Sequence, residues 1–249
     1  MSLDGPSFYD DSDVFQTYMR RRERADSPND TLELPVFEEL LGNVAGQDVL
    51  DLGCGDGRFG LSLLKAGAAS YLGIDGSENM LRVAQANLAG TTGAVRKGRL
   101  EELSLPPGAF DRVCARLVLH YLEDPAHTFQ AVRHSLRGNG LFVFSVEHPV
   151  ITSSDISARE SGLRQEWTVD DYFNTGPRIT HWMGRDVVKH HRTVEEYFCA
   201  AQCAGLVVEA LREARPQRAH FTDEALYNRR KRIPLFLIMA ARKPVSAEA

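Results

Sequence analysis

The sequence predicts an α/β fold built on a doubly wound, mainly parallel sheet. Five short apolar segments suited to strands alternate with segments whose apolar residues have helical spacing. Repeated strand–helix units of this kind form parallel sheets, because parallel strands need a crossover connection. The 249 residues are enough for one sizeable core with a small insertion.

A glycine-rich turn follows the first expected strand, residues 49–52, and is the most informative stretch of the chain. Gly53, Gly55 and Gly57 alternate there, and a helix with Phe59 and Leu63 on one face comes next. Glycine permits a tight turn and close approach of a ligand to the backbone. The free N–H groups of a helix N-terminus attract polar ligands. We therefore expect a ligand at this turn.

The same stretch contains a literal G-x-G-x-x-G at Gly55, Gly57 and Gly60. In dinucleotide-binding proteins this fingerprint begins where the strand ends, whereas here it begins three residues past Leu52. The match is weak, but it leaves open an NAD-dependent oxidoreductase as an alternative.

The remaining core elements follow in order. Strands are expected at 70–75, 94–97, 110–116 and 141–146, the last after a turn at 138–140. Ser77 is a suitable N-cap for a helix carrying Met80 on its buried face, and Asp124-Pro125 begins another that carries Phe129, Val132 and Leu136. Thr193 and Glu196 form a capping box for the last core helix, which ends at Gly205.

Composition limits the possible partners. The hydrophobic share of 43% is ordinary for a soluble globular protein, and the net charge of −5 argues against a domain built mainly to bind nucleic acid. No apolar run approaches the ~20 residues of a transmembrane helix, and the polar start does not resemble a secretory signal. The four cysteines show no disulfide framework or metal-site spacing. We expect a cytoplasmic protein without metal, nucleic-acid or membrane partners.

Residues 49–57, Val-Leu-Asp-Leu-Gly-Cys-Gly-Asp-Gly, together with Gly73-Ile74-Asp75 at the end of the next strand, resemble the class I S-adenosylmethionine (SAM)-dependent methyltransferases. Their first motif runs V-L-D-L-G-x-G-x-G, and an acid at the end of the second strand holds the ribose hydroxyls. A carboxylate such as Asp75 suits this role because it accepts two hydrogen bonds from a diol. The resemblance implies SAM as cofactor and S-adenosylhomocysteine (SAH) as product.

The resemblance also implies the organisation of the chain. Strands near 206–211 and 234–240 would complete a seven-stranded sheet with a terminal antiparallel hairpin. Residues 1–47 would form an N-terminal helical lid, 48–149 the SAM-binding core, 150–191 a substrate-covering insertion and 192–243 the completion of the core. Residues 244–249 are expected to be a disordered tail.

Site residues are assigned by matching positions in this family. The cofactor set is Tyr18, Glu33, Asp51, Gly53, Gly55, Asp75, Gly76, Met80, Leu100, Glu101 and Arg116. Glu33 is placed at the cofactor's ammonium group and Arg116 at its carboxylate. A helix cap for Glu33 and an exposed position for Arg116 are equally open.

Four histidines, His120, His148, His181 and His191, are candidates for proton transfer, because the imidazole pKa is near ~6.5. We select His148, at the end of the fifth strand, and His191, together with Tyr172, as catalytic candidates. The candidate substrate-binding residues are Tyr9, Glu147, Phe173 and Trp182, whose aromatic members can stack on an acceptor. Structural roles remain open for all of these residues.

The sequence therefore predicts a SAM-dependent methyltransferase acting on a small organic acceptor, aromatic or heterocyclic and for example of indole type, in bacterial specialised metabolism; whether O, N or C is methylated stays open. A homodimer is left open. The alternatives are a tRNA or nucleotide methyltransferase, the NAD-dependent oxidoreductase, and a non-catalytic SAM-binding subunit.

Overall fold

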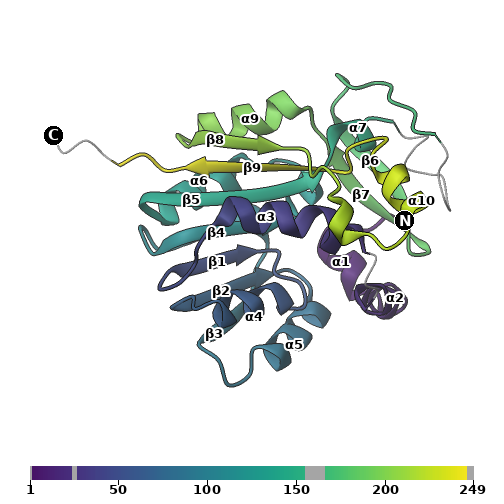
Figure 1. The fold of residues 1–249 in the computed structure, drawn as a ribbon. Helices are drawn as coiled ribbons and strands as arrows, with labels where there is room; N and C mark the ends of the chain where they lie inside the picture. Colours follow the sequence, from purple (N-terminus) through teal and green to yellow (C-terminus); the bar gives the residue numbers. More distant parts are fainter. Residues whose placement is uncertain (1, 24–26, 155–165, 246–249) are drawn as a thin grey trace.

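The structure is a computed structural model that describes residues 2–23, 27–154 and 166–245. Its centre is a seven-stranded sheet of order β3-β2-β1-β4-β5-β9-β8 (Figure 1). The first five strands in this order are parallel, whereas β9 is antiparallel to both β5 and β8. The predicted sheet with a terminal antiparallel hairpin is confirmed. The strand bounds are β1 (Asp48–Leu52), β2 (Ser70–Asp75), β3 (Gly93–Lys97), β4 (Phe110–Arg116), β5 (Leu136–Glu147), β8 (Val207–Arg212) and β9 (Phe236–Arg242).

The fifth strand begins earlier than expected. Leu136, predicted on the buried stripe of a helix, is instead the first residue of β5 and pairs with Phe110 of β4. The pairing then shifts, so that Arg112 lies opposite Leu141, and the intervening Asn139 adopts a φ of 66°. The predicted turn at 138–140 is therefore an irregularity within the strand. Leu136 is fully buried, as it would be on the inner face of a helix or in a central strand. Its apolar side chain therefore does not distinguish the two elements.

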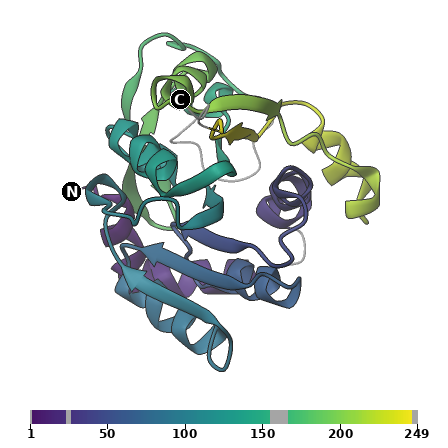
Figure 2. The ribbon, with the colours of Figure 1, turned by 90° about the vertical axis from the view of Figure 1, so that its left-hand side faces the viewer.

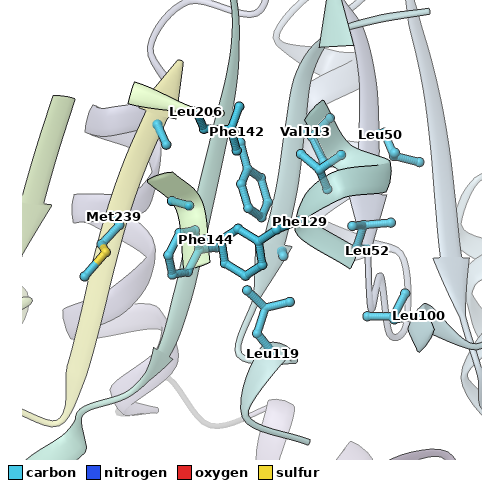
Figure 3. Close-up of a cluster of buried hydrophobic side chains, with 14 of the residues drawn as sticks. Leu50, Leu52, Leu100, Val113, Leu119, Phe129, Phe142, Phe144, Leu206 and Met239 are labelled. Carbon is cyan, nitrogen blue, oxygen red and sulfur yellow. The ribbon is translucent and has the colours of Figure 1, made fainter. Parts of the chain in front are cut away.

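Helices cover both faces of the sheet (Figure 2). On one face, α6 (Ala126–Ser135) and α9 (Val194–Cys203) pack over the strands, and Phe129 of α6 lies 5.5 Å from Phe142 and 5.3 Å from Phe144 between ring centroids (Figure 3). The other face buries side chains such as Val143 against α3 (Leu34–Leu41), α4 (Arg58–Lys65) and α5 (Glu78–Asn87). Successive residues of β5 thus supply opposite cores, as the pleat of a doubly covered strand requires.

Two segments far apart in the chain gather at the end of the sheet where the parallel strands terminate. They are α1 (Gly5–Asp10) with α2 (Ser12–Arg22), and the hairpin of β6 (Gly176–Trp182) with β7 (Arg185–His191) (Figure 1). Leu3 joins them by a parallel bridge to Val187, in which Leu3 N–H donates to Asp186 O and Val188 N–H to Leu3 O, each at 3.0 Å. Their roles as lid and substrate-covering insertion stay predictions.

Shorter elements complete the chain. A single π-helical turn, η1 (Asn29–Glu33), precedes α3, and α7 (Pro149–Thr152) follows β5, while α10 (Glu224–Arg230) lies between β8 and β9. Within the described ranges, no helix has the length and apolar character needed to cross a membrane. Residues 155–165 of the predicted insertion and 246–249 of the predicted tail lie outside the described residues.

Candidate active site

The glycine turn after β1 has a backbone that side chains would disrupt. Gly53 has a φ of 72°, and a Cβ placed on it would lie 2.6 Å from Val118 Cγ2. Gly55 has a φ of 54°, but a Cβ there would meet no atom within 4 Å. The first glycine is therefore required by packing within the protein, whereas the second faces open space.

Asp75, the last residue of β2, is tied directly to this turn. Its Oδ2 accepts a hydrogen bond from Gly55 N–H at 2.8 Å, and its Oδ1 accepts one from Ser77 N–H at 2.9 Å. Burial raises the pKa of Asp75, although these backbone donors favour the charged form. The carboxylate thus stands at the carboxyl end of a parallel strand, where open α/β sheets bind ligands.

Asp51 lies beside the turn on β1 and is almost completely buried. Its Oδ2 accepts a hydrogen bond from Tyr71 OH at 2.7 Å, and its Oδ1 has no hydrogen-bond partner among the described residues. Burial raises the pKa of this carboxyl to about 7. Gly60 on α4 makes room for the Tyr71 ring, since a Cβ on Gly60 would lie 2.2 Å from Tyr71 Cζ.

A cavity of about 210 Å³ begins at this turn and extends under α1, α2 and β6. Its wall contains most of the residues expected to contact the cofactor, and three of those expected to contact the substrate. They are Tyr18, Asp51, Gly53, Gly55, Asp75, Gly76, Met80, Leu100, Glu101 and Arg116, with Tyr9, Glu147 and Trp182. The structure therefore brings together residues that lie up to 173 positions apart (Tyr9 to Trp182).

Part of the cavity wall is aromatic. We call Tyr9, Tyr18, Tyr121 and Trp182 the aromatic cluster. Ring centroids of Tyr9 lie 5.1 Å from Tyr18, 6.2 Å from Tyr121 and 6.3 Å from Trp182, all edge to face. The hydroxyls of Tyr9 and Tyr121 are 3.2 Å apart and share a hydrogen bond. Burial raises the pKa of Tyr18 to about 12 and also raises that of Tyr9 and Tyr121, so all three phenols are protonated at neutral pH.

Comparison with known proteins now adds to this geometry. Residues 50–144 match the model of a methyltransferase domain family. A SAM-dependent methyltransferase from Mesorhizobium loti is 36% identical in sequence, with a TM-score of 0.77 over 87% of this chain and 98% of that one. A putative SAM-dependent methyltransferase from Listeria monocytogenes is 31% identical, also with a TM-score of 0.77, over 85% and 96%. This chain is a class I SAM-dependent methyltransferase.

SAM is accordingly its cofactor, and the site fits that molecule. The Asp75 carboxylate suits a ribose diol, and the open space at Gly55 lets a ligand approach the backbone closely. The sheet also separates this methyltransferase from the NAD-dependent alternative, because the dinucleotide-binding order 3-2-1-4-5-6 lacks the antiparallel strand that stands between β5 and β8 here. Gly60, the last glycine of the literal fingerprint, packs α4 against β2.

A relative with a named activity matches over a shorter stretch. The ubiquinone biosynthesis O-methyltransferase of Nitrosomonas europaea is 32% identical over 117 residues, which is 46% of this chain and 49% of that protein. The methyltransferase described here thus spans about half of that relative's length. Within the described ranges, no group of three His, Cys, Asp or Glu residues is arranged to hold a metal ion.

Glu33 and Arg116 form an ion pair with each other. The sequence predicts Glu33 at the cofactor's ammonium group and Arg116 at its carboxylate. Arg116 Nε donates to both carboxylate oxygens of Glu33 at 3.1 and 3.2 Å, and Ser145 Oγ donates to Glu33 Oε1 at 2.7 Å. Arg116 lines the cavity, whereas Glu33 is fully buried behind it. Arg22, which sequence reasoning did not select, also lines the cavity and pairs with Asp30 at 3.1 Å.

The catalytic candidates chosen from sequence lie outside the cavity wall. His148 caps α7, where its Nδ1 accepts from Val150 N–H, and its Nε2 lies 3.1 Å from Glu213 Oε1. His191 is held between Thr152 Oγ1 at 2.7 Å and the Tyr172 carbonyl at 2.9 Å. Their ring nitrogens are thus engaged by local structure, and their catalytic roles stay predictions that the cavity does not support.

The other outlying residues are similarly engaged or exposed. Tyr172 OH accepts from Val194 N–H at 3.1 Å, and His181 Nδ1 lies 2.8 Å from Asp186 Oδ1. Phe173 is 87% exposed on the surface. Neither Tyr172 nor Phe173 belongs to the cavity wall, whose aromatic residues include Tyr9, Tyr18 and Tyr121.

Among the residues that the structure describes, His120 is the histidine that lines the cavity. The Glu147 backbone N–H donates to its Nδ1 at 3.5 Å, and burial lowers its pKa to about 3, so the ring is neutral. Sequence reasoning considered His120 but preferred His148 for its position at a strand end. Tyr121, its neighbour in the cavity wall, was missed because nothing in the sequence places the turn after β4 against α1.

Proposed function

We propose that this methyltransferase transfers the methyl group of SAM to a small aromatic or heterocyclic acceptor bound at the aromatic cluster. One observation carries the proposal: a single cavity joins Asp75 and the glycine turn to Tyr9, Tyr121 and Trp182. A cofactor and a flat apolar molecule would therefore share one cavity. The indole-type acceptor and a place in specialised metabolism stay predictions.

Each part of SAM has a chemically suitable group in the cavity wall. Asp75 would hold the ribose hydroxyls, and Met80, Leu100 and Glu101 would border the adenine. At the other end of the cofactor, Asp51 Oδ1, which has no partner among the described residues, offers an acceptor for the ammonium group. Arg22 and Arg116 offer positive charge to the carboxylate.

When bound, SAM supplies an electrophilic methyl group on a sulfonium. The protein's contribution is to orient the acceptor and exclude water, and orientation alone supplies up to ~7–11 kcal/mol in favourable cases. Tyr9 and Tyr18 of the N-terminal helices and Trp182 of the hairpin line this space, and we propose that they exclude water from it.

His120 would orient the acceptor as a hydrogen-bond donor. A neutral imidazole has one N–H and one acceptor nitrogen. Because Nδ1 accepts from Glu147 N–H, the proton belongs on Nε2. His120 in this tautomer donates a hydrogen bond and cannot take the acceptor's proton through Nε2.

The test is a methyl-transfer assay that measures SAH formed from SAM with a panel of phenols, indoles and aromatic amines, and with bulk tRNA. The proposal expects SAH with at least one aromatic small molecule and none with tRNA. SAH formed with tRNA alone would overturn it, and so would SAH binding without turnover on any member of a wide panel. Gly55→Val serves as the negative control because its side chain would enter the cofactor space.

A further inference from the structure

Asp10, the last residue of α1, binds the start of α5 from a distant part of the chain. Its Oδ1 accepts a hydrogen bond from the Asn79 backbone N–H at 3.1 Å and another from Ser77 Oγ at 2.7 Å. The Asn79 side-chain amide donates in turn to the Asp10 carbonyl at 3.1 Å. These three hydrogen bonds join the end of α1 to the first turn of α5.

Ser77 connects this contact to the proposed ribose acid. Its backbone N–H donates to Asp75 Oδ1 at 2.9 Å, and its hydroxyl accepts from Met80 N–H at 3.2 Å. Ser77 is fully buried, and a hydroxyl has one proton to donate, which here goes to Asp10. The Ser77 side chain is therefore held by α5 on one side and by α1 on the other.

The Asp75 carboxylate keeps room for a diol. Gly55 N–H donates to its Oδ2 and Ser77 N–H to its Oδ1, so each oxygen has one backbone donor. An ionised carboxylate has about four lone-pair sites, so each oxygen can also accept from one ribose hydroxyl. The direction in which the remaining lone pairs point depends on where the two backbone donors lie.

Pro6 of α1 lies against the same loop. A Cβ placed on Gly76, between Asp75 and Ser77, would come within 2.6 Å of Pro6 Cγ. Pro6 and Gly76 both belong to the cavity wall, whereas Asp10 lies outside it. We therefore expect any effect of Asp10 on the cofactor to pass through the loop that Ser77 anchors.

The charge of Asp10 is not what Asp75 needs. Burial raises the pKa of Asp75, and the negative charge of Asp10 adds to that rise, whereas the N–H groups of Ser77 and Gly55 lower it. The useful contribution of Asp10 is therefore its hydrogen bonds, and a neutral acceptor in the same place would serve.

We propose that Asp10 is a positioning residue for the cofactor: by binding Ser77 and the first turn of α5, it holds Asp75 in the orientation that receives the ribose hydroxyls. The inference rests on the contact between Asp75 and the ribose that the proposed function includes. It gives a role in cofactor recognition to a residue outside the cavity wall. Recognition of the ribose then requires that α1 is docked on α5.

Two ligands test the inference: SAH and its 2′,3′-dideoxy analogue, which lacks both ribose hydroxyls. Each is titrated calorimetrically into the full-length protein. We expect the wild type to bind SAH about 100-fold more tightly than the analogue, because two hydrogen bonds to a carboxylate are lost. In Asp10→Ala this ratio should fall to about tenfold, since SAH binds more weakly while the analogue binds as before. If both ligands weaken alike and the ratio is kept, the role of Asp10 is merely structural and the inference is overturned.

Two further variants separate hydrogen bonding from charge. Asp10→Asn keeps an oxygen that accepts from Ser77 and Asn79 but carries no charge, so it should keep the wild-type ratio. A ratio as low in Asp10→Asn as in Asp10→Ala would assign the effect to charge and overturn the inference. Ser77→Ala removes the hydroxyl link and should lower the ratio as Asp10→Ala does, and the double variant should lower it no further. Additive losses would again overturn the inference.

Asp223→Ala is the matched control. Asp223 likewise caps a helix, accepting from Ala225 N–H at 2.8 Å and Leu226 N–H at 3.3 Å, and it lies outside the cavity wall. Its loss should lower the melting temperature without changing the ratio. Because Asp10 is exposed, Asp10→Ala should fold, and the same melting measurement checks this.

Asp75→Ala distinguishes failure of the inference from failure of the proposed function. It removes the ribose acid itself and should abolish the preference for SAH over the analogue. If the wild type binds both ligands equally, or if Asp75→Ala keeps the ratio, the proposed ribose contact is wrong. If Asp75→Ala abolishes the ratio while Asp10→Ala leaves it unchanged, only the inference about Asp10 is wrong.

Discussion

Phe8 of α1 stacks on Trp182 of β6, with ring centroids 5.6 Å apart and planes inclined by only 9°. Phe8 is fully buried in this contact, and Val14 of α2 and Val187 of β7 are buried in the same apolar cluster. The start of the chain and the hairpin, which are separated in sequence by β1 to β5, therefore form one wall over the cavity. We expect the contact between the Phe8 and Trp182 rings to hold the two parts of this wall together.

Phe8→Ala tests this dependence. Loss of a buried phenyl ring costs about 3–5 kcal/mol where the surroundings cannot collapse. Because Phe8 packs on the hairpin and not on the central sheet, we expect α1 and α2 to open locally, with faster hydrogen exchange over residues 5–22 and weaker SAH binding. Phe173→Ala is the control, since that ring is 87% exposed. Unchanged exchange in Phe8→Ala would contradict the coupling.

Gly55→Val tests the cofactor site against a matched glycine. Gly55 and Gly108 have φ values of 54° and 56°, and a Cβ on either meets no atom within 4 Å. Each substitution should carry a similar backbone strain of roughly 1–2 kcal/mol. We expect Gly55→Val to weaken SAH binding at least about 100-fold, while Gly108→Val leaves it unchanged in calorimetry. Equal losses in both variants would mean that strain, and not the cofactor space, is responsible.

The elements of the fold are predictable from sequence because their signals are local. Alternating apolar runs place the strands, and the capping box of Thr193 and Glu196 appears in the structure as predicted. The start of β5 is the exception. Leu136 is apolar and buried whether it ends a helix or begins a strand, so only its pairing with Phe110 decides between the two.

The residues of the candidate site also differ in whether a local sequence signal predicts them. Asp51, Gly55 and Asp75 belong to one strand–turn–helix–strand unit, and their arrangement follows from motif residues within that unit. Tyr121 and Arg22 reach the cavity only through tertiary packing, which no local pattern reports. His148 is at a strand end, as the sequence indicates. Its two ring nitrogens, however, are bound by the Val150 N–H and by Glu213, and the sequence alone does not show these hydrogen bonds.

Two substitutions at His120 separate donation from packing. His120→Asn keeps an acceptor near the Nδ1 position but lacks the outer N–H, whereas His120→Gln places an N–H group near the position of Nε2. We expect turnover on the acceptor found by the assay to fall about 10–100-fold in His120→Asn, as loss of a hydrogen bond of about 1–3 kcal/mol predicts. His120→Gln should recover part of it, with SAH affinity unchanged in both.

His148→Ala is the comparison for this pair, because His148 lies outside the cavity wall. We expect it to lower stability, through loss of the cap on α7, without lowering turnover of the folded enzyme. A larger loss of turnover in His148→Ala than in His120→Asn would restore the assignment made from sequence.

Asp51 should make stability depend on pH. Burial raises its pKa to about 7 from an unfolded value of 3.8, so the folded state holds a proton that the unfolded state has lost. Stability from this group is therefore fully present below about pH 4 and is lost as the pH rises through about 7, by on the order of 4 kcal/mol. In Asp51→Asn this loss is absent, and the amide oxygen still accepts from Tyr71. Urea unfolding from pH 5 to pH 8 should show a flatter profile for the variant, and parallel profiles would contradict the buried titration.

Arg116 and Glu33 offer a test that separates stability from cofactor binding. Removing the guanidinium in Arg116→Met leaves the fully buried Glu33 carboxylate without its cation, and such losses cost about 3–5 kcal/mol. The double variant, Arg116→Met with Glu33→Gln, removes both charges and should regain much of that stability in urea unfolding. Because Arg116 also lines the cavity, SAH affinity should stay low in the double variant.

Recovery of stability together with full SAH affinity would confine Arg116 to its pairing with Glu33 and leave Arg22 as the cation for the cofactor carboxylate. Recovery of neither would mean that the pair holds η1 against β4 by geometry that neutral side chains do not reproduce. The expected split, with stability regained and affinity lost, arises only if one guanidinium neutralises Glu33 on its buried side and meets the cofactor on the other.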